Sequence, residues 1–183
     1  MEKENSFKAL FLDRDGIVNV DNRYVWEIEK FVFQDDIFEF CRYFKEKGFK
    51  LVIVTNQSGI GRGFFSLEDF QKLNTWMLSR FESERCAIDL LLASTLDPTD
   101  ETASKRERDF RKPAPGMLFA AQEILQIDLQ NSIIIGDNES DIQAGLNAGI
   151  ENRYLVNPHV IPDVSQVSFK NLSECLIRLR KTF

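Results

Sequence analysis

Two carboxylates, Asp13 and Asp15, directly follow a short apolar run, residues 9–12, near the start of the chain. The run is continuous, which is typical of a central parallel strand covered on both faces by helices. Residues two apart on an extended segment point to the same side, so both acids can face one site beyond this strand. Two like charges this close repel, and a bound divalent cation or a shared proton is the usual remedy. The alternative is an ordinary polar turn, because Asp and Gly are common turn residues.

A second apolar run, residues 50–54, ends in Thr55 and a segment rich in amides and glycines, residues 56–63. Such a segment can supply side-chain and backbone donors to a phosphate. It is neither a Walker A loop, which needs Gly-Lys-Ser/Thr, nor a dinucleotide fingerprint. Arg62 in this segment either contacts a second anionic group of a substrate or is a solvated arginine between two flexible glycines.

A third strand is predicted over residues 88–93, and a polar stretch, residues 94–110, follows it. This stretch is long for a loop inside a compact domain, so we expect it to be functional or mobile. It ends at Arg111 and Lys112, and the prolines just beyond limit how far these two cations can move. A fixed lysine can neutralise a phosphate there, and the alternative is a basic linker between strand and helix.

A fourth strand is predicted over residues 132–136 and ends in Asp137. This acid can complete an oxygen cage for a hard cation, because Mg²⁺ typically takes one or two carboxylates together with waters and phosphate oxygens. Asp141 is interpreted as the residue that starts or orients the next helix.

The polar and aromatic segment after the first acids, about residues 16–31, shows no sustained periodicity. We predict that it forms a flap over the carboxylates, from which Arg23 and Tyr24 can reach a bound anion. The alternative is a solvated loop that Tyr24 and Trp26 anchor on the core.

Helical periodicity alternates with these strands along the chain. A helix is predicted to begin at Asp35 or Asp36 and to stop at Gly48, and Ser66 with Asp69 resembles the capping box of a second helix. Further helices are predicted over residues 118–127, 142–148 and 172–179, an edge strand over 154–156, and a loop over 157–167 in which His159 has no assigned role. This alternation favours an α/β fold with a mainly parallel sheet.

Composition bounds the class of protein. The length of 183 residues fits one domain, and the hydrophobic content of 43% supports a real core. The net charge of −6 argues against a nucleic-acid groove but leaves a small phosphorylated ligand open. Cys41, Cys86 and Cys175 lack metal-binding spacing and are interpreted as buried thiols of a reducing compartment. No window approaches the about 20 apolar residues of a membrane span, and we expect a cytoplasmic monomer without a membrane or nucleic-acid partner.

The residues at four successive strand ends carry a resemblance to a known superfamily. In order and context they resemble the haloacid dehalogenase (HAD) phosphohydrolases, in which Asp-x-Asp, Ser/Thr, Lys and Gly-Asp-x-x-x-Asp follow one another along a Rossmann-like sheet. More narrowly, they resemble subfamily IIIA, which contains heptose 1,7-bisphosphate phosphatases and histidinol phosphatases. The resemblance covers about residues 8–156 and rests on the stretches 12–16, 54–63, 111–117 and 136–141. It implies a three-layer α/β/α fold in one domain, residues 1–183, without a large cap domain.

This resemblance implies a mechanism. Asp13 would attack phosphorus and become an aspartyl phosphate, while Asp15 would protonate the leaving oxygen and later deprotonate the hydrolytic water. Mg²⁺ would be held by Asp13, the backbone carbonyl of Asp15 and Asp137. Thr55 and Lys112 would stabilise charge on the equatorial oxygens. The residues expected to contact the substrate are Asp21, Asn22, Arg23, Tyr24, Asn56, Gln57, Ser58, Arg62, Arg111 and Asn138.

Two departures from the subfamily pattern concern metal and substrate. Members often carry a zinc clamp, Cys-x-His then Cys-x-Cys, before Arg-Lys-Pro, and the matching places here are Ser94, Leu96, Arg108 and Phe110. Those side chains cannot hold zinc, so we expect none, and the loop, about residues 94–112, is ordered by packing and ion pairs or is flexible until substrate binds. Heptose enzymes usually read Gly-Asp-Lys where this chain has Asn138, which removes a cation near metal and phosphate.

The expected function is Mg²⁺-dependent hydrolysis of a small phosphorylated metabolite, a heptose bisphosphate or a related sugar phosphate. Alternative enzymes are a histidinol-phosphate phosphatase and a nucleic-acid 3′-phosphatase, the latter disfavoured by the acidic charge. A receiver-type signalling domain also places acids, a Thr and a Lys at strand ends, but it lacks the Asp-x-Asp turn and Gly-Asp-x-x-x-Asp. A non-catalytic sugar-phosphate-binding paralogue is a further alternative, although no catalytic residue of the motifs is missing.

Overall fold

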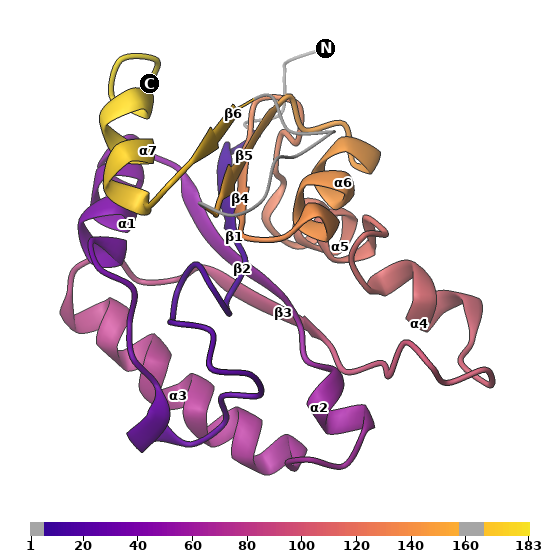
Figure 1. Cartoon of the computed structure of the whole chain (residues 1–183). Helices are drawn as coiled ribbons and strands as arrows, with labels where there is room; N and C mark the ends of the chain where they lie inside the picture. Colours follow the sequence, from indigo (N-terminus) through magenta and orange to yellow (C-terminus); the bar gives the residue numbers. More distant parts are fainter. Residues whose placement is uncertain (1–5, 158–166) are drawn as a thin grey trace.

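A parallel sheet of six strands forms the centre of the structure, a computed structural model that describes residues 6–157 and 167–183 (Figure 1). The strands are β1 (Ala9–Leu12), β2 (Lys50–Asn56), β3 (Leu90–Ser94), β4 (Ile133–Gly136), β5 (Asn152–Val156) and β6 (Val167–Phe169). Their order is β3-β2-β1-β4-β5-β6, and Leu10 of β1 pairs with both Leu51 and Ile133. The chain moves outward through β2 and β3 and then returns to β4 on the other side of β1. Open α/β sheets form a ligand crevice at such a reversal, beyond the carboxyl ends of the strands.

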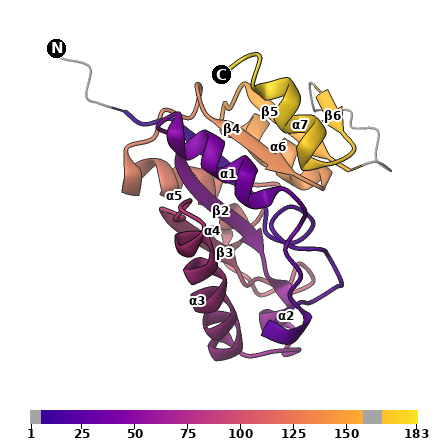
Figure 2. The ribbon, with the colours of Figure 1, turned by 90° about the vertical axis from the view of Figure 1, so that its left-hand side faces the viewer.

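Two helical layers cover the sheet (Figure 2). One face carries α1 (Ile37–Glu46), α3 (Leu67–Ser83) and α7 (Leu172–Leu179), and the other carries α5 (Gly116–Leu125) and α6 (Glu139–Asn147). Alternate residues of β1 belong to the two cores: Leu10 and Leu12 pack with the first layer, whereas Ala9 and Phe11 pack with the second. All four are completely buried, which explains why the strand is apolar throughout. The predicted three-layer α/β/α fold is confirmed.

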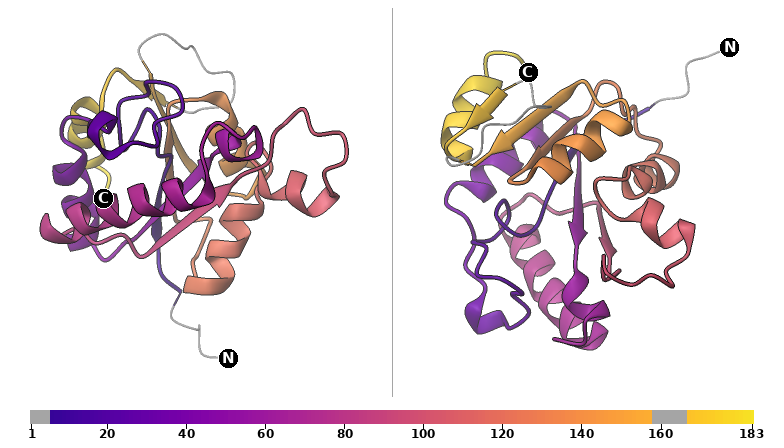
Figure 3. Two further views of the ribbon diagram at one scale, coloured as in Figure 1. Left: turned by 90° about the horizontal axis from the view of Figure 1, so that it is seen from below. Right: turned by 45° about the vertical axis from the view of Figure 1, so that its right-hand side comes forward.

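Besides a 3₁₀-helix in the flap (Ile28–Lys30), two short α-helices occupy segments that the sequence analysis treated as loops. They are α2 (Ser58–Gly61), after the glycine-rich strand end, and α4 (Lys105–Phe110), in the polar stretch before Arg111. The prediction of a continuous loop over residues 94–110 is therefore wrong. Ser104 accepts a hydrogen bond from the backbone of Glu107 and donates its own N–H to the Glu107 carboxylate, a capping box that starts α4. Figure 3 shows α4 and the segment before it extending from the side of the sheet.

The edge of the sheet also differs from the prediction. Residues 154–156 belong to β5, which lies between β4 and β6, so they do not form an edge strand. The three residues of β6 are too few to show a strand period, which is why the sequence pattern did not reveal them. The loop predicted over residues 157–167, with His159, lies almost wholly outside the described residues.

Helix starts follow local signals. Ser66 and Asp69 form the predicted capping box of α3, and Asp36 is the N-cap of α1. α6 begins at Glu139, three residues earlier than predicted, because Asn138 is its N-cap. Among residues 6–157 and 167–183, the helices are too short or too polar to cross a membrane.

Candidate active site

The residues predicted to carry the chemistry meet in the crevice where the strand order reverses. Asp13 follows β1, and its backbone N–H donates to the carbonyl of Ile135 (3.0 Å), which holds it beside β4. Thr55 is buried at the carboxyl end of β2. Lys112 enters from the segment after α4, and its Nζ donates to Asp13 Oδ1 and to the carbonyl of Val54, both at 2.7 Å. Residues 99 positions apart thus form a direct ion pair.

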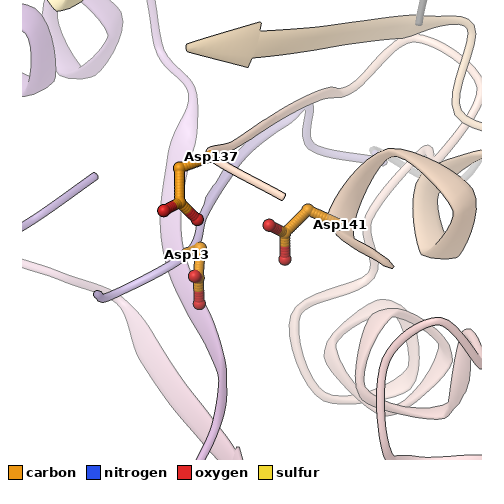
Figure 4. Close-up of side chains that lie close together, drawn as sticks. All are labelled: Asp13, Asp137 and Asp141. Atoms are coloured by element: carbon orange, nitrogen blue, oxygen red, sulfur yellow. The ribbon is translucent and has the colours of Figure 1, made fainter. Parts of the chain in front are cut away.

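Three carboxylates, those of Asp13, Asp137 and Asp141, lie close together at the ends of β1 and β4 (Figure 4). Each offers one ligand oxygen, and these oxygens all lie within 4.8 Å of one another. Carboxylate oxygens are the donors that hard cations such as Mg²⁺ and Ca²⁺ prefer. The donor set therefore fits a hard divalent cation.

Two glycines make room for these carboxylates. A Cβ on Gly16 would lie 2.1 Å from Asp137 Oδ2, and the φ of Gly16 is +88°, a conformation that other residues rarely adopt. A Cβ on Gly136 would lie 2.2 Å from the Cβ of Asp141. The glycines of Asp-x-Asp-Gly and Gly-Asp-x-x-x-Asp thus let two acidic side chains approach the backbone closely.

The electrostatics of the cluster are dominated by burial. Burial raises the pKa of Asp13 well above its usual range, an effect that Lys112 opposes and the neighbouring carboxylates reinforce. Burial and the Asp141 carboxylate raise the pKa of Asp137 to about 7. Burial alone would lower the pKa of Lys112, but the carboxylates of Asp13 and Asp141 outweigh it, so the pKa is raised and the ammonium stays charged. A divalent cation would relieve the remaining repulsion among three acids around one ammonium.

Lys112 also contacts Asp141, whose Oδ1 lies 2.5 Å from its Nζ. The Lys112 side chain is almost fully buried, so this ion pair and the one with Asp13 are poorly screened by solvent. Asn56 holds the lysine in place, because its amide donates to the Lys112 carbonyl (3.0 Å) and accepts from the Lys112 N–H (3.1 Å). β2 and the segment after α4 are thereby joined at the site.

The Asp15 carboxylate is held apart from the three-carboxylate cluster by four side-chain donor atoms. Oδ1 accepts from Asn19 Nδ2 (3.0 Å), and Oδ2 accepts from Gln57 Nε2 (2.7 Å). Arg14 donates from Nε (3.3 Å) and from Nη2 (2.9 and 3.0 Å). Gln57 Nε2 also donates to Thr55 Oγ1 (2.8 Å), so one amide links Asp15 with the hydroxyl at the end of β2.

A cavity of about 390 Å³ opens beside Asp15. Its walls come from the flap and from the segment after β2, and they comprise Asp15, Asp21, Arg23, Tyr24, Asn56, Gln57, Ser58 and Gly59. Seven of these eight residues are among the predicted catalytic or substrate-contacting residues. A second cavity of about 360 Å³ lies on the Asp137 side, and Asp21 lines both.

Four other predicted substrate contacts lie outside this wall. Arg62 donates to Asp97 Oδ1 (3.2 Å) and to the Tyr24 hydroxyl (3.2 Å), which joins α2 to the flap and to the segment after β3. Arg111 donates to the carbonyl of Leu96 (3.2 Å). Asn22 is exposed on the flap, and the exposed Asn138 caps α6 by accepting from the N–H of Ser140. For all four of these residues the role in substrate binding stays a prediction.

Sequence reasoning missed Asp141, Arg14 and Asn19, three residues whose side chains contact the predicted site residues. Asp141 was assigned to the start of a helix, and it does accept the Asn138 N–H (3.2 Å), but it also joins the carboxylate cluster. The signal was its spacing: four residues after Asp137, the first turn of α6 returns its side chain to the end of β4. Arg14, between the two acids of Asp-x-Asp, carried no recognisable signal.

Acids, a hydroxyl and a buried lysine at one edge of a parallel α/β sheet are typical of enzymes that act on phosphoryl groups. In the part of the chain that the structure describes, these residues lie at the reversal of strand order, where such enzymes bind their ligands. The fold and the site therefore define a phosphoryl-handling enzyme of the Rossmann-like class.

Comparisons with known proteins narrow this class. A family model described as HAD-hydrolase-like matches residues 109–156. D-glycero-alpha-D-manno-heptose-1,7-bisphosphate 7-phosphatase of Campylobacter jejuni is 47% identical over 169 residues, 92% of this chain and 94% of that protein. D-glycero-beta-D-manno-heptose-1,7-bisphosphate 7-phosphatase of Yersinia pestis is 45% identical over 152 residues, 82% of this chain and 81% of that protein. The chain belongs to the HAD superfamily and, within it, to the family of these heptose-bisphosphate phosphatases.

A solved structure has the same fold. The crystal structure of D,D-heptose 1,7-bisphosphate phosphatase from B. bronchiseptica, complexed with magnesium and phosphate, matches with a TM-score of 0.82 and 24% sequence identity. The match covers 97% of this chain and 100% of that chain.

Proposed function

We propose that this protein removes the 7-phosphate of a D-glycero-D-manno-heptose 1,7-bisphosphate in a Mg²⁺-dependent reaction. The names of the relatives from Campylobacter jejuni and Yersinia pestis support the substrate, and the magnesium complex of the B. bronchiseptica protein supports the metal. The observation that carries the proposal is the buried ion pair of Lys112 with Asp13 beside two further carboxylates. This arrangement lets a carboxylate and a phosphoryl group, both anionic, approach each other.

Asp13 is the nucleophile in this mechanism. Its carboxylate oxygen attacks phosphorus in line, the bond from phosphorus to the leaving oxygen breaks, and an aspartyl phosphate forms. Asp15 gives a proton to the leaving oxygen and later takes one from the water that hydrolyses the intermediate. Four side-chain donor atoms hold the Asp15 carboxylate at the wall of the cavity in which the ester would bind.

Thr55 and Lys112 stabilise the negative charge that develops on the equatorial phosphoryl oxygens. Mg²⁺ would be held by Asp13, Asp137, Asp141 and the backbone carbonyl of Asp15, and it would supply positive charge that screens the approach of nucleophile and phosphate. Asp141 is an addition to the ligands expected from the sequence.

The sugar and its second phosphate would bind in the cavity beside Asp15. Arg23 and the amides of Asn56 and Gln57 line that cavity and can donate to hydroxyl and phosphate oxygens. Arg62 and Arg111 lie farther along the same side and would meet the second phosphate. We infer that one domain of 183 residues carries all of these groups, and the net charge of −6 supports a small-molecule substrate over nucleic acid.

We also propose that the segment over residues 94–112, which contains α4, is ordered without zinc. Arg108 donates to the carbonyls of Asp100 (2.9 Å) and Glu101 (3.1 Å), and Asp97 pairs with Arg62. These contacts join residues 97–101 to α4 and to the end of α2. The protein's own side chains and backbone thus supply the contacts that a zinc ion would otherwise provide. Activity that survives a zinc-selective chelator but is lost on Mg²⁺ removal would support this.

The substrate proposal predicts a clear order of preference. With Mg²⁺, both anomers of D-glycero-D-manno-heptose 1,7-bisphosphate are compared with histidinol phosphate and with simple hexose phosphates, and ³¹P NMR identifies the phosphate that is lost. We expect loss of the 7-phosphate, with kcat/KM for one anomer at least about 10²-fold above that for histidinol phosphate, because buried polar groups left unpaired penalise a wrong substrate. A higher kcat/KM for histidinol phosphate, or loss of the 1-phosphate first, would contradict the assignment.

A further inference from the structure

Arg14 is a charged residue with no exposed surface, and its only carboxylate partner among the described residues is Asp15. Its Nε and Nη2 both donate to the Asp15 carboxylate, at 2.9 to 3.3 Å. A guanidinium that meets a carboxylate through two nitrogens fixes the plane of that carboxylate as well as its direction. The Asp15 side chain itself is 24% exposed and lines the cavity, whereas Arg14 is fully buried and does not line it.

Two other elements hold the guanidinium. Nη2 also donates to the carbonyl of Val25 in the flap (2.9 Å), and the ring of Phe70 on α3 lies 5.7 Å from the guanidinium carbon. One nitrogen, Nη1, is buried without a hydrogen-bond partner in the part of the chain that the structure describes. A buried charge that leaves a donor unpaired is costly, and a buried ion pair that is replaced as a whole by apolar side chains is often no less stable. Packing alone therefore does not account for an arginine here.

We propose that Arg14 is a positioning residue that holds the Asp15 carboxylate toward the leaving oxygen and ties that orientation to the flap. The proposal rests on the proposed function, because it concerns the proton transfer assigned to Asp15. Asn19 and Gln57 each make a single contact with the carboxylate, whereas Arg14 meets both oxygens. Without Arg14, the Asp15 carboxylate keeps only one hydrogen bond from Asn19 and one from Gln57, and its plane is no longer fixed.

The effect of losing Arg14 on the rate of hydrolysis depends on the leaving group of the substrate. In the first step the bond from Asp13 to phosphorus forms, the phosphorus–oxygen bond of the ester breaks, and the proton of Asp15 moves to the departing oxygen. A sugar alkoxide needs that proton, whereas p-nitrophenolate is a stable anion and leaves without it. Displacement of the Asp15 carboxylate should therefore slow hydrolysis of the sugar phosphate far more than hydrolysis of the aryl phosphate.

The test compares Arg14→Met with the wild type on the two substrates. Met keeps the length of the side chain without its charge, and kcat/KM reports the steps up to release of the leaving group. We expect kcat/KM for the heptose bisphosphate to fall about 10²-fold and that for p-nitrophenyl phosphate to fall less than about 5-fold. Arg14→Lys keeps the charge but not the paired hydrogen bonds, so its loss on the sugar substrate should lie between those of the wild type and Arg14→Met. Arg80→Met, at an exposed arginine of α3, is the matched control and should change neither value.

The outcomes separate two failures. An equal loss on both substrates, or none on the sugar substrate, in a variant whose thermal unfolding matches the wild type would overturn the role of Arg14 and leave the proposed function standing. A variant that unfolds early is replaced by Arg14→Lys, for which the ratio of the two losses decides in the same way. A wild type that hydrolyses neither phosphate would overturn the proposed function, and the role of Arg14 with it.

Discussion

Replacing Asp13 by Asn is expected to abolish phosphate release from both the heptose bisphosphate and p-nitrophenyl phosphate. The amide has nearly the same shape as the carboxylate, but it cannot attack phosphorus, and removal of a catalytic nucleophile costs on the order of 10⁴-fold or more in kcat. The loss should be the same for both substrates, because each must be attacked by the same oxygen. Release of inorganic phosphate under saturating Mg²⁺ measures it.

The control for this variant is Glu123→Gln, which makes the same chemical change at an exposed position of α5. It should retain the wild-type rate. Unfolding curves of Asp13→Asn should show an intact fold, because the substitution removes one of three clustered negative charges that burial already disfavours. A folded Asp13→Asn protein that keeps its rate would falsify the assignment of the nucleophile.

Replacing Lys112 by Met is expected to reduce both activity and stability. Its ammonium neutralises the buried carboxylates of Asp13 and Asp141 and would meet the phosphoryl oxygens, so we expect kcat/KM to fall about 10²- to 10³-fold. Removing one partner of a buried ion pair leaves uncompensated charge, which costs roughly 3 kcal/mol in the free energy of unfolding. Steady-state kinetics and urea unfolding without Mg²⁺ measure the two effects.

The matched control is Lys181→Met, which removes an exposed lysine near the C-terminus. We expect Mg²⁺ to stabilise Lys112→Met more than it stabilises the wild type, since the metal would restore positive charge beside the same carboxylates. Wild-type stability and activity in Lys112→Met would show that the ammonium does not neutralise the cluster.

Much of the site could be predicted from the sequence because its chemistry lies at strand ends. A continuous apolar run that ends in Asp13 indicates both a buried parallel strand and its carboxyl end, and the same holds for Thr55 and Asp137. Parallel strands place these ends at one edge, so the residues converge without any knowledge of strand order. The family resemblance then supplied Lys112, which an Arg-Lys pair alone does not reveal.

The rest depended on three-dimensional contacts. Asp141 has an evident local role as the N3 residue of a capping box, and its second contact, with Lys112, joins segments that the sequence does not relate. Arg14 reads as a polar turn residue, although it is fully buried under the flap. The helix α4 was missed because the charged stretch around it lacks an apolar face, although the capping box at Ser104 could have indicated it. Capping residues near a helix in the sequence predict where that helix starts. Whether a charged side chain is buried depends on elements that are far away in the sequence.

The central claim is that Asp13 carries the phosphoryl group during turnover, and trapping that group tests it most directly. Asp15→Asn should form the aspartyl phosphate from p-nitrophenyl phosphate but hydrolyse it slowly, because no base activates the water. Acid quenching after mixing, followed by mass spectrometry of the peptides, should find one phosphoryl group on the peptide that contains Asp13. Nitrophenol release without a phosphorylated peptide, or a phosphoryl group on any other residue, would contradict the account.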